Sequence, residues 1–182
     1  MPEWKSFTFG EDGEATPTPE QPAQAAPANP AMEPDEYAAK WGTEVSEVSI
    51  ARIENVLEGD GLPHGSSEFI AVTQLEDVRF QIHREPVDAP WLQIETRIEP
   101  EGEGHTELSL QAVANRWNTE HLQPTVIPIE DDGKWVLVAA SRFFVGEGLS
   151  DRQIHAMLRR GLIIGVSAAQ EVPSFFDEAS AE

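Results

Sequence analysis

Residues 126–144 read VIPIEDDGKWVLVAASRFF, and this stretch decides the fold. Its two apolar runs, Val126 to Ile129 and Trp135 to Phe144, flank the sequence Asp131-Asp132-Gly133. Because glycine readily adopts the positive φ of a tight turn, the stretch predicts a β-hairpin of two antiparallel strands. We expect both faces of the second strand to be covered, since both are apolar. One face carries Trp135, Leu137, Ala139 and Phe143, and the other carries Val136, Val138, Ala140 and Phe144.

Three further strands are predicted upstream of the hairpin. Residues 69–72 form a short apolar run, whereas residues 78–82 and 92–98 alternate between apolar and polar side chains. A period of two residues is typical of a strand with one buried face and one wetter face. The wetter face of the last strand carries Gln93, Glu95 and Arg97.

Three helices complete the predicted fold. Apolar residues recur with a helical period over residues 46–58, before Gly59 and Gly61, and again over residues 106–120. Ser150 is a good N-cap for a third helix. The order α-β-β-β-α-β-β-α predicts an α+β fold, in which helices pack on an antiparallel sheet of about five strands.

Composition divides the chain into a leader, a domain and a tail. Residues 1–44 hold seven of the fourteen prolines and a run rich in alanine and glutamine, a composition typical of disordered segments. We therefore expect a disordered leader over residues 1–44. Residues 45–170 are expected to form one folded domain, and residues 171–182 an acidic tail.

Two groups of aromatic residues lie within the leader. Trp4, Phe7 and Phe9 form the first group, which is a candidate contact either with the domain itself or with a protein partner. Tyr37 and Trp41 have the spacing of neighbours on one helix face, and we expect them to pack on the core of the domain.

The charge and the lack of cysteine exclude several classes of function. The chain has 33 acidic and 12 basic residues, a formal net charge of −21, and no cysteine. This charge repels phosphate backbones and anionic lipids, so we expect neither nucleic acid nor a membrane as a partner. Thiolate chemistry and disulfides are excluded. The sequence has no apolar run long enough to span a membrane and no signal segment at its start, which favours a cytoplasmic protein.

The sequence contains no catalytic or metal-binding pattern. Asp131-Asp132-Gly133 lacks the alternating oxygen ligands of a calcium loop. Flexible glycines separate the carboxylates of residues 99–103, so nothing holds a pair of them at acid–base distance. The five histidines lack zinc-ligand spacing; they are His64, His83, His105, His121 and His155. We expect no enzyme activity, no metal and no cofactor.

Four segments of the chain are distinctive in combination. They are Trp91-Leu92-Gln93-Ile94, Ala114-Asn115-Arg116-Trp117-Asn118, the Asp131-Asp132-Gly133 turn, and Leu149-Ser150-Asp151 at the start of the last helix. Through these segments, residues 77–162 resemble the YbjN family of bacterial sensory transduction regulators, whose fold is similar to that of type III secretion chaperones. The resemblance implies a non-enzymatic role in regulation or in protein holding, often as a homodimer and without a cofactor.

The second predicted helix contains two asparagines, which are mediocre helix formers. Asn115 and Asn118 lie near one face of the helix. They either cap backbone groups of a sheet edge or a loop, or they make a polar contact at a binding face. Trp117 lies on the apolar stripe of the helix, where we expect it to pack in the core.

Two functions from different classes remain open. In the first, the chain is a regulatory or chaperone-like domain that binds another protein, in bacterial signal transduction or stress regulation. We expect a homodimer as well, with Arg142, Phe144 and Val145 at its interface, because a single layer of helices covers the long strand on one side only. In the second, a pocket between sheet and helices senses an uncharged or cationic small molecule and modulates a protein partner.

Overall fold

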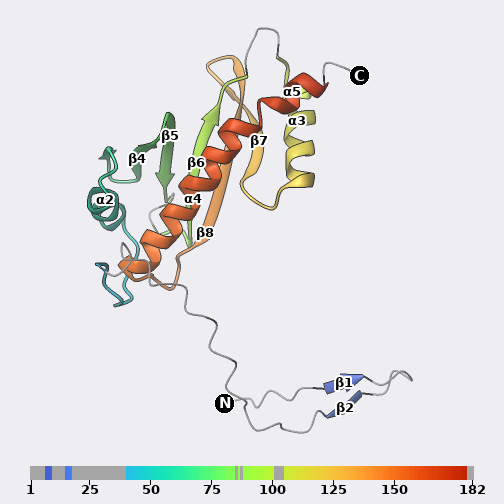
Figure 1. Cartoon of the computed structure of the whole chain (residues 1–182). Coiled ribbons are helices and arrows are strands. Elements are labelled where there is room, and N and C mark those ends of the chain that lie inside the picture. Colours follow the sequence, from blue (N-terminus) through green and yellow to red (C-terminus); the bar gives the residue numbers. More distant parts are fainter. Residues whose placement is uncertain are drawn as a thin grey trace. The chain divides into compact units, whose positions relative to one another are not determined.

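A computed structural model of the chain describes residues 7–9, 15–17, 40–84, 86, 88–100 and 105–179 (Figure 1). The chain divides into two units, Met1–Asp35 and Glu36–Glu182. In the first unit, strands β1 (Phe7–Phe9) and β2 (Ala15–Pro17) pair antiparallel. The composition of the leader did not predict this pairing. The rest of the leader before residue 40 lies outside the described residues, so its disorder stays a prediction.

The second unit is built on one six-stranded antiparallel sheet with the strand order β3-β4-β5-β6-β8-β7. The hairpin predicted around Gly133 is formed by β7 and β8. The strands are β3 (His64–Ser66), β4 (Ile70–Leu75), β5 (Val78–His83), β6 (Trp91–Ile98), β7 (Thr125–Asp131) and β8 (Lys134–Phe144).

The predicted α+β fold with an antiparallel sheet is confirmed, but the sheet has six strands rather than about five. The additional strand, β3, has three residues with Gly65 at its centre. A strand this short shows no alternation of apolar and polar residues, so the sequence did not reveal it.

Four helices accompany the sheet in the described part of the second unit: α2 (Ile50–Gly59), α3 (Glu107–Glu120), α4 (Asp151–Glu171) and the short α5 (Ser174–Ala179). The N-caps of the first three are Ser49, Thr106 and Ser150, whose hydroxyls accept backbone N–H groups of the first turn. The predicted start of the first helix at Ser46 is wrong. Ser46 instead pairs with Leu149 in an isolated antiparallel bridge.

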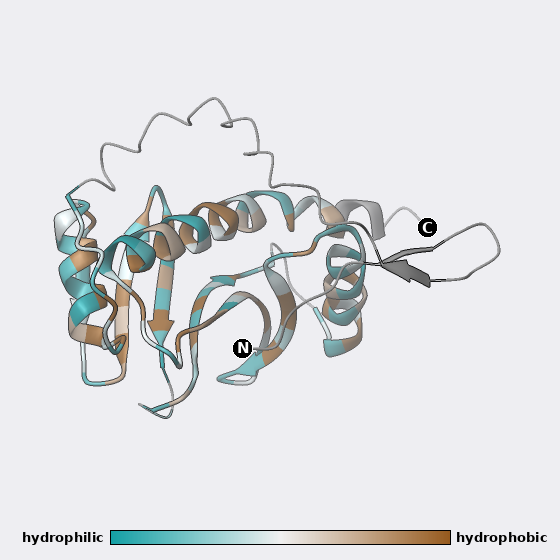
Figure 2. Ribbon diagram, turned by 90° about the horizontal axis from the view of Figure 1, so that it is seen from below, coloured by the Kyte–Doolittle hydropathy of each residue, from teal (hydrophilic) through white to brown (hydrophobic). Residues whose placement is uncertain are grey.

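The helices pack on one face of the sheet. Helix α4 contacts β5, β6 and β8, whereas α2 contacts β3 and β4, and α3 contacts β7 and β8. Figure 2 shows hydrophobic and hydrophilic stretches alternating along α4, as expected for a helix with one buried face. A Cβ atom on Gly161 would lie 2.6 Å from Cδ1 of Ile94, so this glycine allows α4 to approach β6 closely.

Two clusters of buried side chains form the core. The first joins α2 and α4 to strands β4, β5 and β6, and it includes Ile53, Phe80 and Leu158. The second joins α3 to β7 and β8, and it includes Trp117 and Leu137.

The ends of the described domain also contact these clusters. Trp41 packs against the first cluster, in agreement with the core packing expected for it. Its partner in that expectation, Tyr37, lies outside the described residues. Phe175 and Phe176 pack against the second cluster, within the segment predicted to be an acidic tail.

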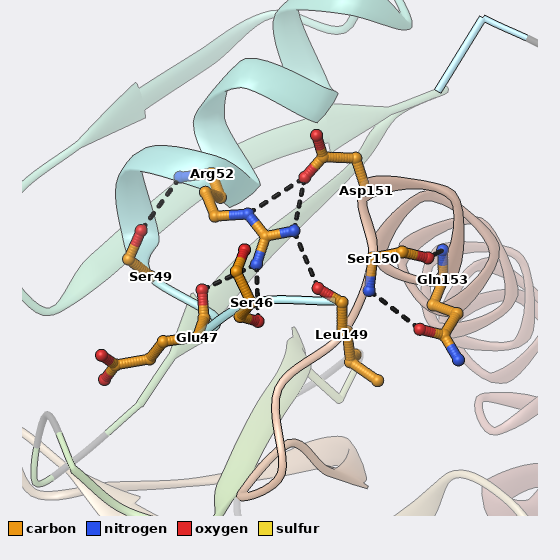
Figure 3. Close-up of polar contacts among 8 residues, drawn as sticks. All are labelled: Ser46, Glu47, Ser49, Arg52, Leu149, Ser150, Asp151 and Gln153. Atoms are coloured by element: carbon orange, nitrogen blue, oxygen red, sulfur yellow. Dashed lines mark hydrogen bonds and ion pairs between the residues drawn. The ribbon is translucent and has the colours of Figure 1, made fainter. Parts of the chain in front are cut away.

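One arginine connects the start of α2 to the start of α4 (Figure 3). The guanidinium of Arg52 donates to Oδ1 of Asp151 from Nε at 3.0 Å and from Nη2 at 2.6 Å. It also donates to the carbonyl oxygens of Ser46, Glu47 and Leu149 at 2.9, 2.7 and 2.8 Å. Arg52 therefore joins two segments that are far apart in the sequence.

Candidate functional site

The side of the sheet opposite the helices is the candidate functional site. We call this side the open face. A row of residues in register crosses it, from Val72 on β4 through Gln81, Glu95 and Ala140 to Thr125 on β7. The residues adjacent to them in each strand point to the helices, which follows from the alternation of side chains along a strand.

Four large apolar side chains are exposed on the open face. They are Val72, Trp91, Ile127 and Phe144, with exposed fractions of 47, 51, 42 and 53%. In the sequence of its strand, each is adjacent to a residue whose side chain points to the helices. Trp91, for example, is followed by the fully buried Leu92. A sheet face in contact with water is normally polar. Exposed apolar side chains on one face are typical of an interaction surface.

Trp91 and Phe144 form an aromatic pair at one end of the open face. They are opposite each other in the β6–β8 ladder, and their rings meet edge to face with centroids 5.4 Å apart. Beside them lies a pocket of about 330 Å³, which is lined by His83, Ala89, Trp91, Gln93 and Arg142. The pair thus combines an apolar surface with nearby hydrogen-bonding groups, as in the anchor sites of protein interfaces.

Four polar side chains are connected across three strands of the open face. Nε2 of His83 lies 3.3 Å from Oε2 of Glu95, and the amide of Gln93 donates to the same carboxylate. Nε of Arg142 donates to Oε1 of Gln93 at 2.6 Å. We call these four residues the polar ladder. Because hydrogen bonds and an ion pair connect these four side chains, their positions are fixed before any partner binds.

The polar ladder changes the acidity of Glu95. The hydrogen bond with the His83 side chain is the largest cause, and it lowers the pKa of Glu95 from its usual value of 4.5. Partial burial acts in the opposite direction, whereas the hydrogen bond with Gln93 and the charges of His83 and Arg142 lower the pKa further. Glu95 is therefore ionised at neutral pH.

A wide groove of about 850 Å³ covers the centre of the open face. Apolar and charged side chains both line it, among them Val72, Arg79, Glu95, Ile129 and Val138. Arg97 on its wall is paired with Asp131 and Glu99. The groove is long enough to contact strands β3 to β8 and is therefore better suited to a segment of protein than to one small polar ligand.

The three residues predicted at a dimer interface separate in the structure. Arg142 and Phe144 lie on the open face, where Arg142 belongs to the polar ladder. Val145 has an exposed fraction of 1% and belongs to the first core cluster. Val145 is therefore not part of the open face, because it follows Phe144 in the ladder with β6 and side chains alternate along a strand.

The two asparagines of α3 also differ in position. The side-chain amide of Asn118 donates to the carbonyl of Val126 and accepts from its N–H, both at 2.8 Å. Asn118 thus caps the outer edge of β7, the last strand of the sheet. Asn115 is exposed, and Trp117 is buried, with Nε1 donating to the carbonyl of Pro124 at 2.9 Å.

Sequence reasoning did not identify several residues of the open face. The sequence predicted only that Val72 and Ile127 belong to strands, and it considered His83 only as a possible zinc ligand. A signal was present at Trp91, a large aromatic residue on the polar side of an alternating strand. Of the first aromatic group, Trp4 lies outside the described residues. Phe7 and Phe9 lie in β1, where the structure describes the backbone alone.

Within the described residues, no group of three or more histidine or acidic side chains is placed to hold a metal ion. In the same part of the chain, none of the helices combines the length and hydropathy that a membrane span requires.

Comparison with known proteins identifies relatives of this fold. The crystal structure described as "YbjN, a putative transcription regulator from E. coli" superposes with a TM-score of 0.55 at 16% identity, covering 76% of this chain and 96% of that one. The structure of the HopA1-SchA chaperone-effector complex gives a TM-score of 0.49 at 12% identity, covering 68% of this chain and 91% of that one.

Sequence comparison is consistent with this likeness. No curated protein matches the chain. Residues 49–172, however, match the family model described as "YbjN: Putative bacterial sensory transduction regulator". This match covers α2 to α4 and every strand of the six-stranded sheet. The chain therefore belongs to the YbjN family.

Proposed function

We propose that this chain is a non-enzymatic regulatory or chaperone-like domain that binds a protein partner through its open face. The observation that carries the proposal is the exposure of Val72, Trp91, Ile127 and Phe144 on a sheet face opposite the helices. A partner that covers these side chains removes their apolar surface from water. This burial stabilises the complex by about 25 cal/mol for each Å² of apolar surface. Membership of a family described as regulators supports the same role.

The polar ladder is expected to contribute specificity rather than most of the affinity. Arg142 and Glu95 present charges whose positions are held by Gln93 and His83. A partner must match these charges or leave them buried without compensation, which costs free energy. The net charge of −21 would also accelerate the approach of a basic partner, an effect that salt reduces.

A second copy of the chain is one partner that fits the proposal. Arg142 and Phe144 are exposed at the end of β8, and a two-fold axis there would place the two Phe144 side chains against each other. Multi-angle light scattering at high micromolar concentration tests this form. A monomer at every concentration would exclude the homodimer and leave a different protein as the partner.

The main experiment is affinity purification of the full chain from its native cell, compared with two variants. Phe144→Glu places a charge on the open face, whereas Leu108→Glu places the same charge on α3, where Leu108 is 78% exposed. We expect Phe144→Glu to lose the partner and Leu108→Glu to retain it. Equal recovery of the partner by both variants would contradict a role for the open face.

Removal of residues 1–39 in the same experiment tests the leader separately. If the partner is recovered without the leader, the domain alone carries the binding surface. If it is lost, then Trp4, Phe7 and Phe9 become the first candidates for substitution. We further propose that the chain acts in the cytoplasm. Its negative charge gives neither nucleic acid nor a membrane a role as partner.

A further inference from the structure

The open face differs in charge from the chain as a whole. Four basic side chains occupy positions of this face in strands β3 to β8, and they are Arg79, Arg97, Lys134 and Arg142. Two acidic side chains share the face with them, Glu95 and Asp131. Four basic and two acidic residues give these positions a formal charge of +2, whereas the whole chain has −21. The open face is therefore locally positive on an acidic protein.

Two of the four cations are compensated within the domain. Arg97 is paired with Asp131 on β7 and with Glu99, which follows β6. Arg142 lies close enough to Glu95 for its charge to act on that carboxylate. A partner therefore gains little from a further anion at either of these arginines.

Arg79 is the clearest available charge in the groove. It is exposed on the groove wall, and its backbone carbonyl accepts from Thr96. Its side chain forms no hydrogen bond or ion pair with any of the described residues. An arginine in this position can donate two parallel hydrogen bonds to a carboxylate, a geometry that lysine does not offer.

Arg79 and the aromatic pair lie at opposite ends of the open face. Arg79 precedes Phe80, which is opposite Thr96, so it lies beside Arg97 near the end of β6, whereas Trp91 begins that strand. From Trp91 to Arg97, the strand rises by about 20 Å. An extended segment of a partner covers this length with about six residues.

We infer that the partner segment held by the open face is both apolar and acidic, with an apolar side chain on Trp91 and Phe144 and a carboxylate at Arg79. The inference rests on the proposed function of the open face and adds the chemistry of the partner. Between the two ends, the exposed Val72 lines the groove and favours further apolar side chains in the same segment.

The negative charge of the whole chain acts on a different stage of binding. At physiological ionic strength, ions screen charges beyond about 8 Å, so distant acidic residues affect mainly the approach of a partner. Side chains in contact with the open face meet the charges of that face instead. A partner that is basic in total can therefore still present a carboxylate to Arg79.

Single-stranded nucleic acid is the other macromolecule that combines negative charge with rings that stack on exposed aromatic side chains. It carries a phosphate at every nucleotide, however, and would place phosphates beside Glu95 and Asp131 as well as beside Arg79. A peptide can place a carboxylate only where the face is positive. The two carboxylates of the face therefore favour a peptide over an oligonucleotide.

Phage display of random peptides on the full chain tests the inference without a known partner. Peptides of about twelve residues are long enough, since about six residues span the two ends of the face. We expect the selected sequences to be enriched in aspartate and glutamate, with an aromatic residue about six positions from the acid. Enrichment of lysine and arginine, which the net charge of −21 alone would produce, would overturn the inference.

A parallel selection on Phe144→Glu separates this inference from the proposed function. If no sequence is selected on the original chain, or if Phe144→Glu selects the same sequences, the open face is not the binding surface and both fail. If the sequences depend on Phe144 but are not enriched in acids, the open face remains the binding surface. Only the acidic character of the partner is then overturned.

Fluorescence polarisation with one selected peptide locates the carboxylate. Arg79→Gln should weaken binding about fivefold, since an ion pair at a partly exposed site contributes about that factor. It should have almost no effect on a second peptide in which glutamine replaces the acidic residue, because the ion pair is already absent. Equal weakening of the two peptides would overturn the contact with Arg79.

Arg160→Gln is the matched control for this measurement. Arg160 is exposed on α4, which packs on the other side of the sheet, and the substitution removes the same charge from the chain. It should leave the affinity of both peptides unchanged, and circular dichroism verifies that each variant folds. If Arg160→Gln weakens the acidic peptide as much as Arg79→Gln does, the total charge of the chain explains the preference and the inference fails.

A labelled single-stranded oligothymidine tests the nucleic-acid alternative. At an ionic strength of about 0.15 M, we expect it neither to bind at micromolar concentration nor to displace the selected peptide. Absence of displacement supports the peptide. Displacement that Arg79→Gln reduces would assign the face to nucleic acid and overturn the inference.

Discussion

At the scale of single residues, Arg52 connects two parts of the described domain through several polar contacts. Its five hydrogen bonds reach one carboxylate and three backbone carbonyls from two distant segments. The planar guanidinium can donate in several fixed directions at once, whereas the ammonium of lysine cannot reproduce this geometry. Nothing in the sequence around Arg52 indicated this role, because Leu149 and Asp151 are 97 and 99 residues away in the chain.

The first prediction concerns this residue. Arg52→Lys should lower the free energy of unfolding by about 2 kcal/mol. The reason is that the carbonyl groups of Ser46, Glu47 and Leu149, at the Ser46–Leu149 bridge, lose their hydrogen-bond donors. Urea titration followed by circular dichroism measures the change. Arg160→Lys on the exposed face of α4 is the control and should have almost no effect. A loss of stability below about 0.5 kcal/mol for Arg52→Lys would show that water replaces the guanidinium without cost.

The second prediction concerns Glu95, whose pKa is lowered by the hydrogen bond with His83. A carboxyl group with a lower pKa in the folded state contributes stability above its unfolded pKa. That contribution is lost as the pH falls through the folded pKa. The original chain should therefore lose more stability than Glu95→Gln when the pH is lowered from neutrality to below 4.5, the usual pKa of this group. Urea midpoints at several pH values measure the difference, and parallel curves for the two proteins would contradict it.

At the scale of elements, a side chain of α3 forms hydrogen bonds with the backbone of β7, the edge strand of the sheet. Asn118 satisfies both backbone groups of Val126 on the side of β7 that has no neighbouring strand. An uncapped edge strand exposes backbone groups that can pair with another chain. Asn118 therefore stabilises β7 and also removes a site for unwanted association.

The third prediction follows from this contact. Asn118→Ala should cost about 1–3 kcal/mol, because two backbone groups of β7 lose their partners. Hydrogen exchange at the N–H of Val126 should become faster by a corresponding factor. Asn115→Ala, at an exposed residue of the same helix, is the control. Similar exchange rates at Val126 in both variants would exclude the proposed role of Asn118.

The turn before α4 depends on a glycine for two separate reasons. Gly148 has a φ of 80°, and a Cβ atom there would lie 2.6 Å from the carbonyl oxygen of Ser46. Gly133 in the β7–β8 turn has a φ of 74°, but a Cβ atom added to it would have no neighbouring atom within 4 Å. The two glycines therefore distinguish the cost of backbone conformation from the cost of crowding.

The fourth prediction uses this difference. Gly133→Ala should cost about 1 kcal/mol through its positive φ alone. Gly148→Ala should cost at least about 1 kcal/mol more, because the collision is with the backbone of the Ser46 bridge and cannot be relieved by a rotamer change. Thermal and urea unfolding of the two variants give the comparison. Equal losses would mean that the bridge moves aside easily.

At the scale of the whole molecule, a side chain that precedes the predicted start of the domain at residue 45 packs on its core. Among the described residues, the first that packs on either core cluster is Trp41. Composition placed the boundary after residue 44, because glycine, threonine and glutamate follow Trp41 directly. Trp41 belongs to the domain through its contacts with Gly59 and His155, which no local pattern reveals.

The fifth prediction locates this boundary. A chain that begins at residue 40 should unfold at the same urea midpoint as the full chain, because it retains both core clusters. A chain that begins at residue 45 should be less stable by about 1–2 kcal/mol, since it lacks the half-buried indole of Trp41. Equal midpoints for the two truncated chains would support the boundary that composition suggested.

The sequence by itself determined the class of the fold. Alternation in β5 and β6, the Asp131-Asp132-Gly133 turn and the cap at Ser150 are local patterns, and local backbone preferences decide them. These patterns also separated the helix side of β6 from its polar side. The resemblance to the YbjN family, which four segments of the sequence carried, is confirmed by the match over residues 49–172.

Only the tertiary structure decided which side chains come together. His83, Gln93 and Arg142 meet because β6 lies between β5 and β8 in the sheet, although β7 precedes β8 in the chain. The same order exposes Trp91 and Phe144 as a pair. Contacts between distant segments depend on strand order and helix packing, and a local pattern carries no information about either.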